Sequence, residues 1–416
     1  MIKYQISPYY KFIRPSQLIN IDMESVEEIQ KIKNEELFLL YNKHRGEKLL
    51  VNPVIYTFLT HCARPVSFDT LLRRLAKQFD ENTSDVKPIV EDFLESMLSK
   101  RILFDAEHVK AIRNYIKSSD NVLEPLKKGT VLDHYVLTKL LSIHIPIEVH
   151  LAESIKTNET VILKLLRIEA GLNEEIKQDM IQNFSQEFRI MQKMDEHPNI
   201  CALVEYVEGQ NIYGALEFIQ AVSIRKRIDE IKPMPSLEKR LNWYAQTLDA
   251  FAHIHKAGVV HGDVHTSNIL LKNDSEIKII DFDMAFHVEL RADENVVYGG
   301  AFEFIAPEKI NINAFHIAKE PADFQSEVYQ LGLVGYFILF GTLPFKGLTW
   351  EELAQNIIQN EADFSTENKE IAPKMILFLQ KALNKTPHKR FKDAIEMKAQ
   401  WVSILKDIEI EKDVLA

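Results

Sequence analysis

The chain has 416 residues, 46% of them hydrophobic, so it can bury the cores of roughly two or three domains. Its 61 acidic residues outnumber its 50 basic ones, and the formal net charge of -11 argues against a nucleic-acid or membrane-surface partner. The two cysteines, Cys62 and Cys201, lack the spacing of metal ligands, which argues against a disulfide scaffold or a zinc module. Because the start is too polar for a secretory signal and the longest apolar run (residues 331–345) is broken by Gly and Pro, we expect a cytoplasmic globular protein.

The first part of the chain, residues 1–116, predicts a small domain with a hairpin, helices and a closing strand. Apolar periodicity and local start and turn signals define each element. The expected elements are a hairpin that turns at Gly46, a helix from Pro53 capped by Asn52, a helix capped by Ser67, a helix from Ser84 or Asp85, and a strand over 101–104.

This order of elements is typical of a winged helix. Over roughly residues 36–105 it resembles the PqqD-like domains, which recognise the leader peptides of ribosomally made, modified peptides. The resemblance implies a precursor-peptide partner, and a generic winged helix that packs on its own chain or on a second copy is an equal alternative. DNA binding is disfavoured by the near-neutral local charge. A polar segment with a proline, residues 117–132, is the expected linker to a second domain over 133–407.

Two motifs in the second domain carry chemistry. HGDVHTSNILL places Asp263 and Asn268 five residues apart, directly before an apolar strand. The spacing resembles that of a kinase catalytic loop, in which an aspartate orients the attacking hydroxyl and an asparagine holds magnesium. IKIIDFDMAF then brings an apolar strand to Asp281 and Asp283, whose carboxylates can bind the cation that bridges ATP phosphates.

These motifs stand in the order found in protein kinases, and residues 133–405 resemble that family. VILK resembles the strand that ends in the phosphate-pairing lysine, here Lys164, and Glu187 lies where a helix glutamate meets that lysine. The APE motif at 306–308 and Arg390 match a glutamate and arginine that pair in the family. The resemblance implies a bilobal α+β fold, with a β-rich N-lobe and a helical C-lobe, and ATP and magnesium as cofactors.

The resemblance also implies a nucleotide site between the lobes. The residues expected to contact the nucleotide are Lys164, Glu217, Ile219, Ser142, His144 and Val149. Ser142, His144 and Ile147 stand where the phosphate loop of the family carries glycines. Glycines let backbone N–H groups approach phosphates closely, whereas branched residues restrict the backbone. The sequence therefore leaves nucleotide affinity as an open question.

Further positions depart from the family pattern. Gly262 replaces an arginine that anchors phosphorylated activation loops, so control by such phosphorylation is not expected. His265 replaces a lysine and is similar to the histidine of aminoglycoside phosphotransferases, while Ala301 replaces a threonine near the catalytic aspartate. Asp283 replaces a glycine at a turn, which aspartate tolerates because it adopts left-handed backbone readily. Glu327 stands where a supporting helix usually carries aspartate.

The retained groups favour an active enzyme, because phosphoryl transfer depends mainly on positioning and charge neutralisation. We interpret the chain as a kinase that phosphorylates Ser or Thr hydroxyls of a protein, or of a ribosomal precursor peptide held by the N-terminal domain. A small-molecule phosphotransferase of the aminoglycoside type and an ATP-binding pseudokinase with a regulatory role are the alternatives. The expected catalytic residues are Asp263, Lys164, Glu187 and His265, and the expected metal ligands are Asn268, Asp281 and Asp283.

Overall fold

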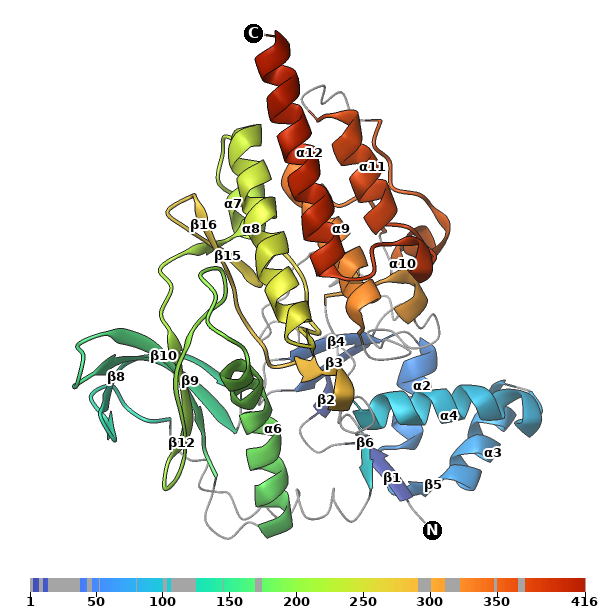
Figure 1. Cartoon of the computed structure of the whole chain (residues 1–416). Coiled ribbons are helices and arrows are strands. Elements are labelled where there is room, and N and C mark those ends of the chain that lie inside the picture. The colour runs from blue at the N-terminus through green and yellow to red at the C-terminus, as the bar shows by residue number, and fades with distance from the viewer. Residues whose placement is uncertain are drawn as a thin grey trace.

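The computed structural model of the chain is shown in Figure 1. Three of its parts matter for the site: an N-terminal part, a lobe built on a β-sheet, and a helical lobe. Gly46, Asn52 and residues 117–124 of the expected linker lie outside the residues that the structure describes. The described residues are 3–6, 10–13, 38–42, 47–51, 53–79, 81–99, 103–105, 125–144, 146–168, 174–290, 301–310, 322–347, 350–365 and 371–415.

The N-terminal part has a hydrophobic core of its own, to which α2 contributes Ile55 and Phe58 and α4 contributes Phe93. The hairpin, the helices and the closing strand that the sequence predicts are confirmed, whereas the short strands β1, β2 and β5 were not expected. The last helix begins at Thr83, one residue before the expected start. The elements of the N-terminal part are β1 (Lys3–Ile6), β2 (Tyr10–Ile13), β3 (Phe38–Asn42), β4 (Glu47–Val51), α2 (Pro53–His61), β5 (Val66–Ser67), α3 (Phe68–Phe79), α4 (Thr83–Ser99) and β6 (Leu103–Asp105).

The N-lobe is a six-stranded antiparallel sheet in the order β11-β12-β10-β9-β8-β7, with helix α6 beside it (Figure 1). Side chains alternate between its faces, so Lys164 points to one side of β10 while Leu163 and Leu165 join an apolar cluster on the other. Residues 125–132, expected in the linker, lie against this sheet. The elements are β7 (Val131–Leu132), β8 (Tyr135–His144), β9 (Ile147–Ser154), β10 (Thr160–Leu166), α6 (Glu174–Lys193), β11 (Leu203–Glu208) and β12 (Ile212–Glu217).

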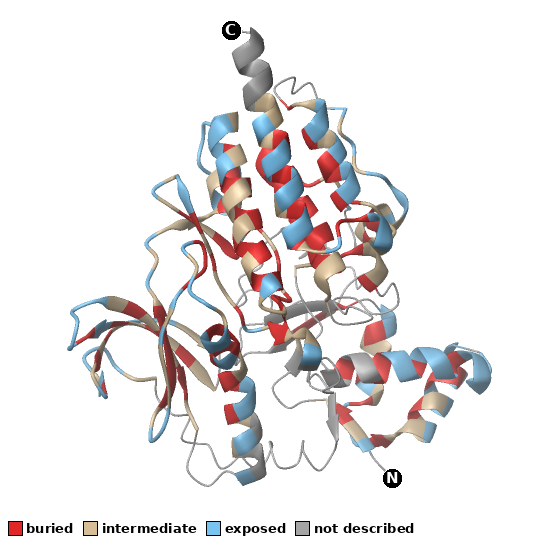
Figure 2. Cartoon of the chain, in the orientation of Figure 1, coloured by how far each residue is buried: buried red, intermediate tan, exposed pale blue. Residues whose placement is uncertain are grey.

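The C-lobe is a bundle of helices around α9 (Phe324–Phe340), which is almost entirely buried (Figure 2). Asp323 and Ser326 cap its start reciprocally, and it ends at Gly341. The other helices are α7 (Ile224–Asp229), α8 (Leu237–Lys256), α10 (Trp350–Gln359), α11 (Pro373–Ala382) and α12 (Ala394–Leu415).

Short strands and turns connect the lobes and shape the edge of the cleft. The catalytic loop, which carries the motif HGDVHTSN (His261–Asn268), lies between β14 and β15. The DFD motif (Asp281–Asp283) follows β16 directly. No helix among the described residues has both the length and the apolar character that crossing a membrane requires. The remaining elements are β13 (Val222–Ser223), β14 (Val259–Val260), β15 (Ile269–Lys272), β16 (Glu276–Ile279), β17 (Phe286–His287), and the 3-10 turns Val288–Leu290, Phe302–Phe304, Pro307–Lys309 and Pro387–Lys389.

Candidate active site

A cavity of about 700 Å³ lies between the sheet of the N-lobe, helix α6 and the strand that carries the DFD motif. Most residues that the sequence predicted for nucleotide contact line it, namely Ser142, Val149, Lys164, Glu217 and Ile219. The side chain of His144 lies outside the described residues. The sequence analysis did not predict the apolar residues that line the cavity from both sides of the cleft. The only signal for them in the sequence was the periodicity of apolar residues. They are Ile162, Met180, Phe184, Cys201, Leu270 and Ile280.

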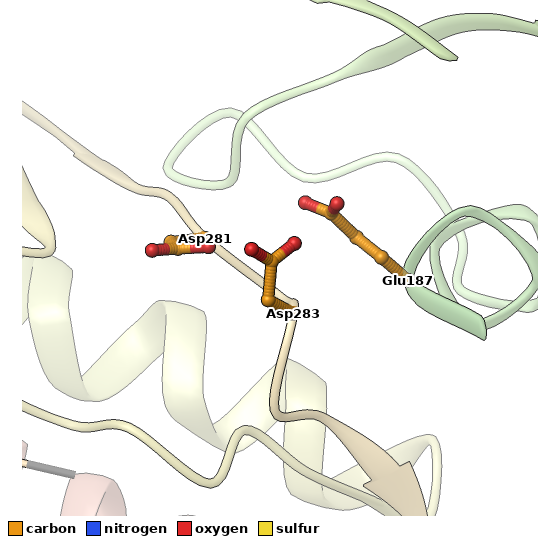
Figure 3. A group of neighbouring side chains, drawn as sticks. All are labelled: Glu187, Asp281 and Asp283. Atoms are coloured by element: carbon orange, nitrogen blue, oxygen red, sulfur yellow. The ribbon is translucent and has the colours of Figure 1, made fainter. Parts of the chain in front are cut away.

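The ammonium group of Lys164 is the centre of the charged end of this cavity. It donates to both carboxylate oxygens of Glu187, each at 2.8 Å, and to Asp283 at 2.8 Å. Asp281 lies slightly farther away, with an oxygen 3.7 Å from the same nitrogen. Figure 3 shows the three carboxylates converging from two elements, Glu187 from α6 and the two aspartates from the DFD segment. The Lys164–Glu187 pair that the sequence predicted is therefore formed.

The electrostatics of this cluster are dominated by its excess of carboxylates. Burial by itself lowers the pKa of Lys164, but attraction to Glu187, Asp283 and Asp281 outweighs it and the net shift is upward. Burial and the neighbouring Asp283 raise the pKa of Glu187, and the same two causes raise the pKa of Asp281. For Asp283, Lys164 overcomes desolvation and holds the pKa well below its usual range. Three carboxylates around one cation leave a net negative site that favours a further positive charge.

Asp263 lies in the loop before β15, where its side chain is held on both oxygens. The backbone N–H of Ala301 donates to Oδ1 at 3.3 Å, and the side-chain amide of Asn268 donates to Oδ2 at 3.2 Å. His265 Nδ1 accepts from the backbone of Ser267, so its other nitrogen, 3.4 Å from Asp263 Oδ2, carries the proton. Burial raises the pKa of Asp263, but His265 and these further contacts overcome it and the net shift is downward. The aspartate is thus ionised and fixed in orientation.

Buried groups support this loop from below. Glu327 on α9 accepts from the backbone N–H of Gly262 at 2.7 Å, so this side chain, longer than the aspartate usual at its position, reaches the loop. His255 contacts the other oxygen of Glu327 at 2.8 Å. Because His255 Nδ1 accepts from the N–H of Ala394, its Nε2 carries the proton that it donates to Glu327. These hydrogen bonds connect α12, α8 and α9 in series, and they hold the catalytic loop at Gly262.

The backbone explains why position 262 carries no arginine. Gly262 has φ of +82°, and a Cβ atom there would lie 2.3 Å from the carbonyl oxygen of Met284. Any side chain would therefore displace the DFD segment. The expectation of a left-handed residue at Asp283 is wrong: the positive φ of this turn is at Asp281, at +68°. Phe282 between the two aspartates is fully buried and packs on His261, with ring centroids 4.8 Å apart.

Two further ion pairs fix the surroundings. Arg390 forms two parallel hydrogen bonds to Glu308 of the APE motif, at 2.7 and 2.6 Å, as the sequence predicted. At the hinge, residues 217–219, the carboxylate of Glu217 accepts from Lys278 on β16 at 2.7 Å. This bond holds the Glu217 side chain against β16, and Glu217 is one of the residues that line the cavity.

Comparison with known proteins decides the family. The family model of the protein kinase domain matches residues 148–402, which is more than half of the chain. The chain belongs to the protein kinase family. The bilobal fold that the sequence analysis expected follows from this membership, and the curled sheet and the helical lobe agree with it.

Several kinases resemble the chain at low identity. The sperm motility kinase Z of Mus musculus is 28% identical over 57% of this chain and 44% of its own length. The serine/threonine-protein kinase PknB of Mycobacterium leprae is 26% identical over 65% of this chain and 43% of its own, and PrkC of Bacillus subtilis is 28% identical over 60% and 37%. The chain thus spans less than half the length of these curated relatives.

The residues of this kinase fit the magnesium that the family implies. Asp281 Oδ1 is buried and, among the described residues, has no hydrogen-bond partner. The amide nitrogen of Asn268 is engaged by Asp263, which leaves its oxygen available to a cation. Hard cations prefer oxygen ligands of this kind. Asp281, Asn268 and the carboxylate of Asp283 could therefore hold magnesium beside the nucleotide phosphates.

Proposed function

We propose that this chain is an ATP- and magnesium-dependent protein kinase that phosphorylates Ser or Thr hydroxyls. The observation that carries the proposal is the presence of an ionised, oriented Asp263 beside a cavity that contains the Lys164–Glu187 pair and the DFD carboxylates. Such groups supply positioning and charge neutralisation, which account for most of the catalysis of phosphoryl transfer. The similarity to PknB and PrkC, both named serine/threonine-protein kinases, supports serine or threonine as the acceptor.

In this proposal Asp263 accepts a hydrogen bond from the substrate hydroxyl. The hydroxyl oxygen forms a bond to the γ-phosphorus, the bond from that phosphorus to the β–γ bridging oxygen breaks, and ADP leaves with that oxygen. The hydroxyl proton passes to Asp263. Lys164 contacts the α- and β-phosphates, and the backbone of Glu217 and Ile219 binds the adenine. Magnesium, when bound, neutralises charge on the transferring phosphate.

His265 is the residue that orients Asp263 in this mechanism. Its protonated nitrogen lies 3.4 Å from Asp263 Oδ2, and Ser267 fixes its tautomer. Protein kinases with a lysine at this position place an ammonium group there, whereas His265 places an imidazole nitrogen 3.4 Å from the carboxylate. A contact from His265 to the γ-phosphate is compatible with its partial exposure. We therefore propose that His265 lies next to the reacting groups and acts by orienting Asp263.

For the substrate we propose a protein or a ribosomal precursor peptide bound by the N-terminal part. The described strands of one of its sheets lie in the order β2-β3-β4, so β2 and β4 are at the ends of that order. A peptide that extends a sheet gains main-chain hydrogen bonds, and tethering raises the effective concentration of its hydroxyls at the active site. The resemblance of this part to PqqD-like domains supports the proposal.

The decisive test of transfer uses γ-labelled ATP, magnesium, the full chain and a lysate as substrate pool. Wild type should label polypeptides, and Asp263→Asn should lower the rate by about 10³-fold while it retains ADP binding. Asp274→Asn, on the β15–β16 turn, is the matched control because Asp274 is paired with Arg227 and Lys239 outside the cavity. Label on low-molecular-weight compounds alone would favour a small-molecule kinase. ADP binding without any transfer would overturn the proposal in favour of a pseudokinase.

The substrate proposal needs a separate measurement on the polypeptide that is labelled. If the N-terminal part binds the substrate away from the phosphorylated hydroxyl, then a peptide shortened to the region around that hydroxyl should have a KM about 10²-fold higher with kcat unchanged. An equal KM for the full and shortened substrates would contradict leader recognition without affecting the kinase assignment.

A further inference from the structure

The phosphate hairpin of this kinase, β8 to β9, has a back face that its glycine-free sequence does not explain. Paired residues of neighbouring strands share a face, and Val149 pairs with Lys164 on the cavity face. Glu148 pairs with Leu165 and His150 with Leu163, so these two polar side chains lie on the opposite face, beside an apolar cluster. A strand that alternates in this way would normally bury apolar residues at those positions.

Both polar residues are nevertheless buried. Glu148 is 4% exposed and His150 is 1% exposed. A buried carboxylate costs free energy unless it is paired and hydrogen-bonded, so the partners of Glu148 indicate what the residue does. His150 Nε2 lies 2.8 Å from one of its oxygens, and the guanidinium of Arg167 donates to the other at 2.6 Å.

Arg167 joins the hairpin at two points. Its side chain reaches Glu148 on β9, and its backbone N–H donates to the carbonyl of Pro146, in the turn of the hairpin, at 2.8 Å. Arg167 directly follows the last residue of β10, the strand that carries Lys164. The tip of the hairpin is therefore tied to the strand that holds the phosphate-binding lysine.

A third partner comes from the chain that enters the kinase domain. The backbone N–H of Leu126 donates to Glu148 at 3.1 Å, and the Leu126 side chain packs on the apolar cluster behind the sheet. The next turn is attached too, because the N–H of Gly129 donates to the carbonyl of Leu137 on β8 at 2.7 Å. One carboxylate thus connects the phosphate hairpin, the end of β10 and the entering segment.

We propose that Glu148 and Arg167 are positioning residues that hold the phosphate hairpin in its nucleotide-binding position, and that the entering segment at Leu126 is part of the same device. Glycine-rich loops bind phosphate by bending their backbone toward it, and this hairpin, with Pro146 and Ile147 at its tip, cannot bend in that way. A fixed hairpin avoids the loss of affinity that a partly populated binding state would cause. The inference rests on the proposed nucleotide site.

The test measures ADP binding to the full chain by calorimetry. Glu148→Gln removes the charge and keeps the shape, and we expect the dissociation constant to rise about tenfold. Arg167→Gln should have the same effect, the double variant should lose no more than either single one, and Arg167→Lys should recover most of the affinity. Glu153→Gln is the control because Glu153 is an exposed glutamate on the same strand. Once transfer is measured, the KM for ATP should rise while kcat and the KM for the phosphate acceptor stay constant.

A matched ADP affinity in wild type, Glu148→Gln and Glu153→Gln would overturn the inference and leave the nucleotide site intact, whereas a wild type that binds no ADP would remove the proposed function. If Glu148→Gln does not fold, hydrogen exchange in the wild type decides. The amide of Arg167 should then exchange slowly without nucleotide, because it is bonded to Pro146. Exchange as fast as that of an open loop, with protection only after ADP is added, would show a mobile hairpin and contradict the proposal.

Discussion

The ammonium nitrogen of Lys164 lies 2.8 Å from an oxygen of Asp283, a residue that stands where protein kinases usually have glycine. Lys164 also bonds to Glu187, so its positive charge is shared between carboxylates before any nucleotide arrives. A nucleoside diphosphate must compete with Asp283 for the ammonium group of Lys164.

Replacing Asp283 should therefore strengthen nucleotide binding without metal but not with saturating metal. In buffer with a chelator, Asp283→Gly should bind ADP about fivefold more tightly, because one competing negative charge is gone. With saturating magnesium the gain should vanish, because Asp283 is among the proposed metal ligands. Calorimetry under both conditions measures this, and equal affinities of variant and wild type in chelator would contradict the competition.

Gly129 and Gly262, two of the glycines with positive φ, provide a matched pair for testing the catalytic loop. Gly129 has φ of +90° with no atom within 4 Å of an added Cβ, whereas a Cβ at Gly262 would meet a carbonyl oxygen at 2.3 Å. Gly129→Ala should lower the free energy of unfolding by about 1–2 kcal/mol from backbone strain alone. Gly262→Ala should lower it by about 3 kcal/mol or more and reduce kcat, because the DFD segment must move. Urea unfolding of both variants compares them, and equal losses would argue against the close contact.

The Arg390–Glu308 pair should stabilise the C-lobe far more than an exposed pair of the same type. The side chain of Arg390 is fully buried and makes two bonds to Glu308, so Arg390→Ala leaves a carboxylate without its partner. We expect a loss of about 3–5 kcal/mol in the free energy of unfolding. Arg189→Ala, which removes an exposed pair with Glu208, should cost less than about 1 kcal/mol. Denaturant unfolding at pH 7 gives both values, and similar losses would refute this ranking.

Glu148 should make stability depend on pH in the acid range. Burial raises its pKa, but His150, the N–H of Leu126 and Arg167 overcome burial, and the net pKa lies below the ordinary value of 4.5. Its stabilising contribution is therefore present above about pH 4.5 and is lost as the pH falls through the lowered value. The difference in unfolding free energy between wild type and Glu148→Gln should stay constant above about pH 5 and shrink as the pH falls from about 4.5 toward the lowered pKa. A constant difference over this range would show that the charge contributes nothing.

The sequence predicted which residues gather around the cavity better than it predicted their contacts. Lys164, Glu187, Asp263 and Asn268 could be placed because their motifs follow one another along the chain in the order of the protein kinase family. The ion pair between Lys164 and Asp283 could not, since the two residues are 119 positions apart and either one alone is an ordinary surface charge. The left-handed residue at Asp281 was missed because the family pattern directed attention to position 283.

The N-terminal part and the buried network show another limit of sequence reasoning. The hairpin and helices there were predicted from periodicity, whereas β1 was missed because its partners, β5 and β6, lie roughly 60 and 100 positions further along the chain. Glu148 and His150 alternate with apolar residues, a pattern typical of a strand with one side exposed to solvent. Their burial depends on Arg167 and Leu126, which lie on different elements. Alternation alone cannot show which polar face a neighbouring segment covers.

The tip of the phosphate hairpin has a consequence for chemical inhibition. Pro146 and Ile147 line the cavity together with Val149. Their apolar side chains form a surface where most kinases have glycine, which has no side chain. An inhibitor that places a flat apolar group against this surface would bury apolar area that glycine-rich kinases do not offer. Selectivity for this enzyme could thus be designed into the phosphate end of a compound, a region that usually discriminates poorly between members of the family.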